Sequence, residues 1–216
     1  MLRLVGFDLD GTLLNSLPDL ADAVNDALKR EGLPQRTVEE VRQFIGNGVY
    51  LLIQRAAAPV TEEAVLKRLK EHFDAYYGVH YCDKSRLYDG IADLLNRLRD
   101  CGVQVVVYSN KPAEFVKGIT NQLFPSYDFA GVLGQHKDFP KKPDAGQFKQ
   151  LQAKLGIADA ECCYVGDSDV DVQTAKNAGV RFVGVDWGYR ERSVLEEAGV
   201  TCIVHTAEEL AEKLIG

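Results

Sequence analysis

The sequence predicts an α/β fold, in which a parallel sheet carries helices on both faces and a small all-helical domain is inserted near its start. Two observations predict it. From Ile91 onward, apolar runs of strand length alternate with helical patterns, which is typical of parallel sheets built from strand–helix–strand crossovers. Before that point, the stretch from Asn15 to Lys84 shows helical patterns only, and it follows a first apolar run from Leu2 to Phe7.

Length and charge limit the function classes. The 216 residues are enough for one large domain or for a core domain with a modest insertion. A formal net charge of −7 argues against a nucleic-acid-binding surface, which is normally basic. No apolar run approaches the roughly 20 residues of a membrane span, and the first residues lack the pattern of a signal peptide. The five cysteines lack metal-binding spacing and fit a reducing compartment. We expect a cytoplasmic monomer or homodimer that binds neither nucleic acid nor a membrane.

The first strand ends in two aspartates. The run from Leu2 to Phe7 predicts a short buried strand, which Gly11 ends. Asp8 and Asp10 therefore lie where the strand gives way to a loop, at the carboxyl edge of the expected sheet, where open α/β sheets bind ligands. A simple turn would explain Asp10 and Gly11 but leaves Asp8 unexplained.

The inserted domain comes next in the chain. Apolar residues at helical spacing, a Pro near one helix start and capping residues predict four helices, at 17–28, 37–45, 49–58 and 61–76. We therefore assign residues 15–84 to a helical cap domain and residues 1–14 and 85–216 to the α/β core. Because the insertion leaves the core directly after Asp8 and Asp10, we expect its two linkers to flank the site and the cap to close over Asp8.

The rest of the core alternates between strands and helices. We expect strands at 103–107, 129–133, 163–165, 182–185 and 202–204, and helices at 91–100, 113–123, 145–155, 170–178 and 207–215. Polar motifs follow three of these strands. Ser109-Asn110-Lys111 follows the strand at 103–107, Lys141-Lys142-Pro143 follows the strand at 129–133, and Gly166-Asp167-Ser168-Asp169-Val170-Asp171 follows the strand at 163–165.

Four motifs in this order resemble the haloacid dehalogenase (HAD) superfamily of phosphotransferases: Asp-x-Asp-Gly-Thr-Leu, Ser-Asn-Lys, Lys-Pro and Gly-Asp-x-x-x-Asp. The resemblance spans the chain from Asp8 to Asp171 and implies a Rossmann-like core. One departure is that Lys142-Pro143 continues as Asp144-Ala145, whereas the family's third motif usually continues Lys-Pro-x-Pro. It leaves open whether Lys142 or Lys141 points inward.

The residue types of these motifs suit phosphoryl transfer. Asp8 is the expected nucleophile, which forms an aspartyl-phosphate, and Asp10 is the expected general acid and base. Mg²⁺ held by Asp8 and Asp167 would screen the charge of the phosphate. The resemblance adds the main-chain carbonyl of Asp10 as a ligand. Asp171 would support the metal directly or through water, with Ser168 and Asp169 beside it.

The remaining site residues are expected to bind the phosphate. Ser109 would hydrogen-bond a phosphoryl oxygen, Lys142 would offset charge on the phosphate and on Asp8, and Asn110 would orient substrate or loop. The main-chain N–H groups of Leu9 and Asp10 would bind further oxygens. Taken alone, Ser109-Asn110 is better explained as a turn and Lys142 as a solvated loop residue, and the Asp167–Asp171 stretch equally as a helix cap. Their joint occurrence at successive strand ends favours a site.

The substrate is less defined. Asp10 argues against phosphonate hydrolases and dehalogenases, whose patterns lack this acid. Two segments are similar to phosphoglycolate phosphatases: Asn15-Ser16-x-Pro-Asp-Leu, and Ile45-Gly46-Asn47-Gly48 with Arg55-Ala56 after it. Gly46-Asn47-Gly48 is suited to substrate selection, although a plain helix–helix turn also explains it. We expect a phosphatase for a small phosphorylated metabolite such as 2-phosphoglycolate. A phosphatase for sugar phosphates, nucleotides or pyrophosphate, a phosphomutase, and a non-catalytic phospholigand-binding module remain the alternatives.

Overall fold

The computed structural model describes residues 1–216 and divides into two compact units. Unit 1 comprises Met1–Leu14 and Leu87–Gly216, and unit 2 comprises Asn15–Arg86. The second boundary lies two residues later than the sequence suggests. The two connecting segments, β2 (Leu14–Asn15) and β3 (Arg86–Leu87), form a small two-stranded sheet.

Unit 1 is built on a six-stranded sheet in the order β5-β4-β1-β6-β7-β8, and every recorded strand pair in it is parallel. The strands are β1 (Leu4–Phe7), β4 (Gln104–Pro112), β5 (Gly131–Gln135), β6 (Cys162–Gly166), β7 (Arg181–Val185) and β8 (Ile203–Val204). The α/β prediction is confirmed. β1 lies between β4 and β6, and all four of its residues are buried, because helices cover a parallel sheet on both faces.

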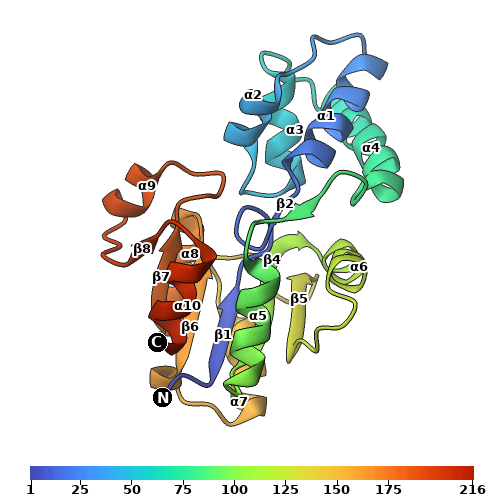
Figure 1. Ribbon diagram of the computed structural model, residues 1–216. Coiled ribbons are helices and arrows are strands. Elements are labelled where there is room, and N and C mark those ends of the chain that lie inside the picture. Colours follow the sequence, from blue (N-terminus) through green and yellow to red (C-terminus); the bar gives the residue numbers. More distant parts are fainter. The chain divides into compact units, whose positions relative to one another are not determined.

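Helices alternate with these strands. They are α5 (Ile91–Asp100), α6 (Ala113–Leu123), α7 (Gly146–Leu155), α8 (Asp169–Ala178), α9 (Arg192–Glu197) and α10 (Ala207–Ile215), with a short 3-10 helix, η1 (Asp159–Glu161). In Figure 1, α5 and α10 lie side by side in front of the sheet, and they pack against each other. Behind the sheet, Phe148 of α7 and Ala175 of α8 pack with Leu4 of β1 and Tyr164 of β6 in one hydrophobic cluster.

Unit 2 contains four helices: α1 (Leu17–Arg30), α2 (Val38–Phe44), α3 (Val49–Ala57) and α4 (Glu63–His80). Each packs an apolar face inward, as Val24, Val41, Ile53 and Leu69 illustrate. One buried charge lies among them. Asp19 is 1% exposed, and its carboxylate accepts hydrogen bonds from Lys84 N (2.9 Å), Ser85 N (2.8 Å) and Ser85 Oγ (2.6 Å). These bonds attach the end of unit 2 to its first helix.

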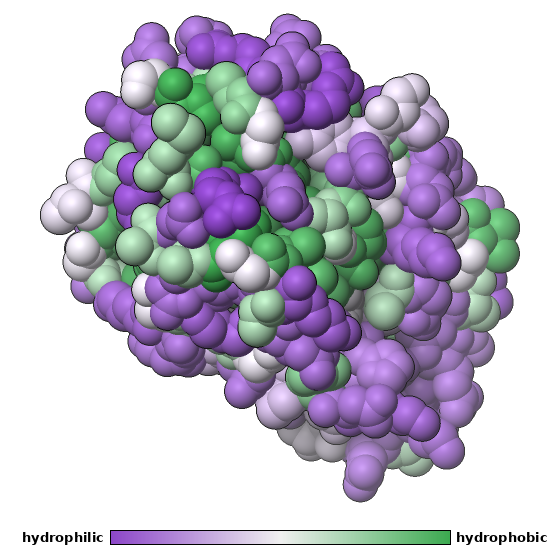
Figure 2. Space-filling model, turned by 90° about the horizontal axis from the view of Figure 1, so that it is seen from below, coloured by the Kyte–Doolittle hydropathy of each residue, from purple (hydrophilic) through white to green (hydrophobic).

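The sequence-based elements differ from the structure in a few places. The strand expected at 129–133 begins two residues later, at Gly131, and α9 and η1 were not expected because their apolar patterns are too short to show a helical period. No helix is long and apolar enough to cross a membrane. On the face drawn in Figure 2, hydrophilic residues surround the hydrophobic ones that reach the surface.

Candidate active site

The polar motifs of unit 1 meet at the carboxyl edge of the sheet because the register of the central strands aligns them. Phe7 of β1 lies beside Val107 of β4 on one side and Val165 of β6 on the other. Asp8 therefore leaves the sheet between its two neighbours. Its own N–H donates to Val165 O at 2.9 Å, and Ser109 and Asp167 follow two residues after their paired positions.

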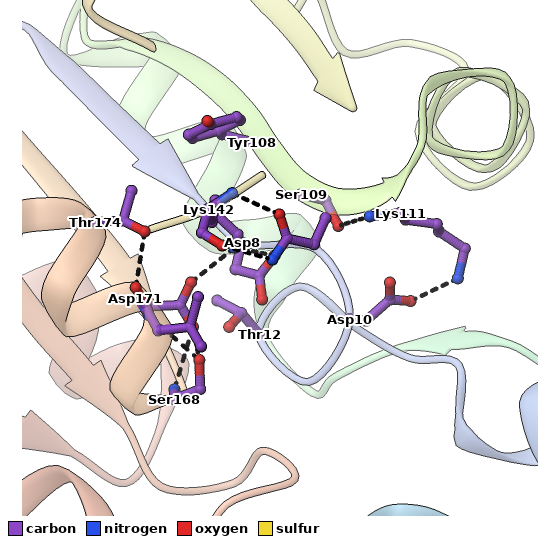
Figure 3. Close-up of polar contacts among 12 residues, drawn as sticks. Asp8, Asp10, Thr12, Tyr108, Ser109, Lys111, Lys142, Ser168, Asp171 and Thr174 are labelled. Carbon is purple, nitrogen blue, oxygen red and sulfur yellow. Dashed lines mark hydrogen bonds and ion pairs between the residues drawn. The ribbon is translucent and has the colours of Figure 1, made fainter. Parts of the chain in front are cut away.

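Three carboxylates converge on this edge. Oxygen atoms of Asp8, Asp167 and Asp171 all lie within 4.8 Å of one another, and Asp167 and Asp171 are buried. A single ammonium group bridges two of them. Lys142 Nζ lies 2.8 Å from Asp8 Oδ1 and 2.7 Å from Asp171 Oδ1 (Figure 3). Lys142, rather than the exposed Lys141, therefore points inward.

Lys142 is fixed from its backbone to its tip. The side-chain amide of Asn110 holds its main chain, because Asn110 Oδ1 accepts from Lys142 N at 2.7 Å and Asn110 Nδ2 donates to Lys142 O at 3.2 Å. At the other end, Lys142 Nζ lies 3.3 Å from the hydroxyl of Tyr164, which itself donates to Tyr108 O at 2.8 Å. Both groups of the Asn110 amide are thus used on the loop that carries Lys142.

The electrostatics of the cluster follow from burial. Burial raises the pKa of Asp8 well above its ordinary range, Lys142 opposes this rise, and the neighbouring Asp171 and Asp167 add to it. For Lys142, burial lowers the pKa, but Asp171 and Asp8 outweigh burial and raise it well above the usual value. The cluster therefore keeps its ammonium charged and holds its carboxylates under mutual repulsion.

Both carboxylate oxygens of Asp171 accept hydrogen bonds. Its Oδ1 accepts from Lys142, and its Oδ2 accepts from Ser168 N at 3.1 Å and from Ser168 Oγ at 2.6 Å. The Ser168 hydroxyl in turn accepts from Asp171 N, which completes a capping box at the start of α8. Ser168 and Asp171 therefore form the N-terminal cap of α8 and are also part of the candidate site. Asp169, which follows Ser168, lies in the first turn of this helix.

Asp167 is held by two loops. Its Oδ1 accepts from the buried hydroxyl of Thr12 at 3.2 Å, and its Oδ2 accepts from Tyr189 N at 2.7 Å. Burial and the nearby Asp171 raise the pKa of Asp167 to about 6, although the Tyr189 N–H opposes that rise. Gly11 has a φ of +88°, and a Cβ there would lie 2.5 Å from Asp167 Oδ2. No larger residue fits this turn.

Asp10 pairs with a cation that the sequence reasoning did not assign. Lys111 Nζ lies 2.9 Å from Asp10 Oδ1, and the two side chains are 6% and 14% exposed (Figure 3). The signal was present, since Lys111 directly follows Ser109 and Asn110 at the end of the same strand. Ser109 is 3% exposed, and its Oγ accepts from Lys111 N at 3.2 Å.

The turn after Asp8 is closed by its own backbone. Leu9 O accepts hydrogen bonds from the N–H groups of Thr12, Leu13 and Leu14 at 3.0 to 3.3 Å. This arrangement turns the chain sharply while Asp8 and Asp10 stay at the edge of the sheet. The N–H group of Leu9, which the sequence predicts to bind phosphate, lies in this turn.

Unit 2 contains the Gly46-Asn47-Gly48 loop, which joins α2 to α3. Gly46 and Gly48 have φ angles of +116° and +91°, so both occupy backbone conformations that favour glycine. Arg55 of α3 fixes this loop by donating to Phe44 O at 2.8 Å and to Asn47 Oδ1 at 2.9 Å. The Gly46-Asn47-Gly48 loop is therefore held by hydrogen bonds to the helix that follows it.

The donors of unit 1 fit a magnesium ion. Carboxylate oxygens are the ligands that Mg²⁺ prefers, and three of them lie together at the strand ends. The cluster has three carboxylates and one ammonium, which bridges two of them, so when ionised it retains an excess negative charge that a divalent cation would balance. The Asp171 carboxylate has three polar partners (Lys142 Nζ, Ser168 N and Ser168 Oγ), whereas Asp167 has two and Asp8 one, which favours Asp8 and Asp167 as the direct ligands.

Comparisons with known proteins cover nearly the whole chain. The model of the haloacid dehalogenase-like hydrolase family matches residues 5–185. The phosphoglycolate phosphatase of Haemophilus influenzae is 36% identical over 203 residues, which are 91% of each chain. That of Mannheimia succiniciproducens is 38% identical over 195 residues, 87% of each chain.

Two solved structures are also similar to this chain over nearly its whole length. A predicted phosphoglycolate phosphatase from Haemophilus somnus superposes with a TM-score of 0.91 at 35% identity, covering 98% of this chain and 97% of its own. A crystal structure from Lactobacillus delbrueckii subsp. bulgaricus also gives a TM-score of 0.91, at 34% identity, and covers 99% and 98% of the two chains. The similarity therefore includes unit 2 as well as the sheet.

Proposed function

The chain belongs to the haloacid dehalogenase-like hydrolases and is a phosphatase of that family, and from this premise we propose that it hydrolyses a small phosphorylated metabolite, 2-phosphoglycolate first among the candidates. The reaction runs through an aspartyl-phosphate on Asp8 and requires Mg²⁺. The observation that carries the proposal is the buried cluster in which Lys142 bridges Asp8 and Asp171 beside Asp167.

Asp8 is the nucleophile in this proposal. Its carboxylate attacks phosphorus, a bond from Asp8 oxygen to phosphorus forms, and the ester bond to the leaving oxygen breaks. Lys142 lies 2.8 Å from the attacking carboxylate and reduces the repulsion between it and the anionic phosphate. Asn110 and Tyr164 keep that ammonium in place. The hydroxyl of Ser109 and the N–H groups of Leu9 and Asp10 bind the phosphoryl oxygens.

Asp10 handles the protons. It first donates a proton to the leaving alkoxide and then takes one from the water that attacks the aspartyl-phosphate, which breaks the bond to Asp8 and releases inorganic phosphate. Lys111, 2.9 Å away, fixes the orientation of the Asp10 carboxylate throughout. Because the second step starts with Asp10 deprotonated, the same side chain serves both steps.

Asp8 and Asp167 would hold Mg²⁺, with the main-chain carbonyl of Asp10 as a further ligand and Asp171 as a support through water. When bound, the ion supplies positive charge that offsets the phosphate and the carboxylate cluster. Thr12 and Tyr189 N donate hydrogen bonds to the two oxygens of the Asp167 carboxylate that would take part in this site.

The substrate proposal is supported by the relatives of this chain. Proteins named phosphoglycolate phosphatase match it at 36 to 38% identity over most of its length. A screen of phosphorylated metabolites with Mg²⁺, including 2-phosphoglycolate, hexose phosphates, nucleotides and pyrophosphate, tests it. The highest kcat/KM is expected for 2-phosphoglycolate. A higher value for another ester would replace the substrate, and transfer of phosphate to a second metabolite without its release would indicate a phosphomutase.

Removal of divalent cations is expected to abolish phosphate release, and added Mg²⁺ is expected to restore it. The physical reason is that the ionised carboxylate cluster repels an anionic substrate unless a divalent cation offsets it. Steady-state phosphate release before and after dialysis against a chelator measures this. Full activity after exhaustive dialysis would contradict the assignment of Asp8 and Asp167 as metal ligands.

The affinity for Mg²⁺ is expected to rise with pH through about 6, since Asp167 must lose a proton to bind the ion and its pKa in the metal-free protein is about 6. In the metal-free protein, the contribution of Asp167 to folding stability changes with pH in the opposite direction. A carboxyl with a raised pKa keeps its proton to higher pH in the folded chain than in the unfolded one, so its contribution to stability is lost as the pH rises from the ordinary pKa of 3.8 toward 6. Calorimetric titration with Mg²⁺ between pH 5 and 7.5 measures the affinity and the released protons. An Mg²⁺ affinity independent of pH would contradict the raised pKa of Asp167.

Gly48→Val is expected to reduce turnover of 2-phosphoglycolate much more than turnover of a small aryl phosphate. Gly48 has a φ of +91° at the start of α3, a conformation that a β-branched residue adopts only under strain, so the loop and its backbone donors should move. In the proposed function this loop selects the leaving group. A small aryl ester depends mainly on Asp8, Asp10 and the metal.

Gly32→Val is the matched control for this variant. Gly32 also lies in unit 2 with a positive φ, +67°, and a Cβ there meets nothing within 4 Å. It should carry similar backbone strain and leave the ratio of the two activities unchanged. Equal losses on both substrates in Gly48→Val, with an unchanged circular dichroism spectrum, would remove the loop as the specificity element.

A further inference from the structure

A short loop follows β7 and returns to the carboxyl edge of the sheet in unit 1. Its residues Trp187, Gly188 and Tyr189, hereafter the 187–189 strap, lie between Asp186 and α9. The ends of the loop are joined, because Asp186 Oδ2 lies 3.0 Å from Arg192 Nη1. Asp186 Oδ1 also lies 2.8 Å from Nδ1 of His205, which follows β8. The strap is therefore anchored to the sheet at its base.

The strap contacts Asp167 through its backbone. Tyr189 N donates to Asp167 Oδ2 at 2.7 Å, and Tyr189 is 7% exposed. Gly188 lies so close that a Cβ built on it would be 2.3 Å from Asp167 Cβ and 2.4 Å from Asp167 Oδ2. Gly188 does not have a positive φ, so its conformation does not require glycine. The reason for glycine here is the space that Asp167 occupies.

A second contact links the strap to the first motif. Trp187 Nε1 donates to Thr12 O at 3.1 Å, and the hydroxyl of the same Thr12 donates to Asp167 Oδ1 at 3.2 Å. The hydrogen bonds thus form a closed ring from strap to Thr12 to Asp167 and back to the strap. Rotation of the Asp167 carboxylate would break a bond to each of its oxygens. The ring therefore fixes the direction of both oxygens.

We propose that the 187–189 strap positions the Asp167 carboxylate for its divalent cation, which makes Gly188 and Trp187 positioning residues for metal binding. The identity of the cation as Mg²⁺ rests on the proposed function. Hydrogen bonds behind a ligating carboxylate orient it, and their loss typically lowers metal affinity about 10- to 100-fold. Plain packing of the loop would not explain the contact, because Tyr189 donates a hydrogen bond to Asp167 and a Cβ at Gly188 would overlap the Asp167 carboxylate.

Gly188→Ala tests the proposal in the absence of substrate. The added methyl group should displace the Asp167 carboxylate, and we expect the dissociation constant for Mg²⁺, measured by isothermal titration calorimetry, to rise at least about tenfold. Gly184→Ala is the matched control. Gly184 lies on β7, four residues earlier, and its Cβ would meet Leu195 Cδ1 at 2.9 Å, so it disturbs packing away from Asp167. We expect it to lower the melting temperature and leave the Mg²⁺ affinity unchanged.

Trp187→Phe is a second test of the strap, and it applies even if Gly188→Ala does not fold. It keeps an aromatic ring near Tyr88, whose ring centre lies 6.4 Å from that of Trp187, and it removes the N–H donated to Thr12. We expect weaker Mg²⁺ binding than in the wild type, by less than in Gly188→Ala, with turnover restored by higher Mg²⁺. An unchanged affinity in a folded strap variant would overturn the role of the strap and leave the proposed function in place. A wild-type protein that bound no Mg²⁺ would overturn both.

Discussion

Asp8→Asn is expected to abolish phosphate release, with a loss of at least about four orders of magnitude, as is typical when a nucleophile is removed. The amide fills the space of the carboxylate but cannot attack phosphorus. We expect the fold to be at least as stable as the wild type in the absence of metal, since burial and two neighbouring carboxylates raise the pKa of Asp8 and therefore oppose its charge. Phosphate release and thermal unfolding measure the two effects.

Acid-quenched wild-type protein should in addition retain phosphate from labelled substrate, and Asp8→Asn should retain none. Asp144→Asn is the control. Asp144 follows Lys142-Pro143 and accepts from Gly146 N at 2.8 Å, outside the carboxylate cluster, so activity should stay near that of the wild type. Near-normal turnover in Asp8→Asn would show that the covalent mechanism is wrong.

The fold and the positions of the motifs were largely predictable from the sequence, because both depend on local patterns. Apolar runs mark the strands, and each run ends in a polar motif. Parallel strands bring their carboxyl ends to one edge, so the meeting of Asp8 and Asp167 follows from the topology.

The supporting contacts were not predictable in the same way. Thr12 and Tyr189 N hold the two oxygens of Asp167, and they are 177 positions apart, so no spacing in the sequence relates them. Asn110 was expected among the phosphate-binding residues, to orient either substrate or the loop, and the structure uses both of its amide groups on the main chain of Lys142. Such pairings depend on side-chain directions at the end of the sheet, which a one-dimensional pattern does not contain.

Lys142 is the residue on which the charges of the site depend. Its ammonium lies within ion-pair distance of both Asp8 and Asp171, and the Lys142 side chain is 3% exposed. Breaking a buried ion pair by removing one partner leaves the other charge unpaired in a poorly solvated place. We therefore expect a Lys142 variant to reduce both catalysis and stability, whereas Asp8→Asn leaves Lys142 paired with Asp171 and should not destabilise the fold.

Lys142→Met is expected to reduce kcat at least about a hundredfold, since a preorganised charge beside the transferred phosphate is lost. In chelator at pH 8, the free energy of unfolding should fall by about 3 to 5 kcal/mol. The deficit should shrink as the pH is lowered, because without Lys142 the pKa of Asp8 lies even further above its unfolded value, so stability is lost as pH rises and regained as Asp8 takes up a proton. Urea unfolding at pH 8 and pH 5.5 measures this. Lys141→Met is the matched control, since Lys141 precedes Lys142 but is exposed, and neither turnover nor stability should change appreciably. Equal effects of the two substitutions, or a Lys142→Met deficit that grows toward low pH, would refute the assignment of Lys142 as the buried cation of the site.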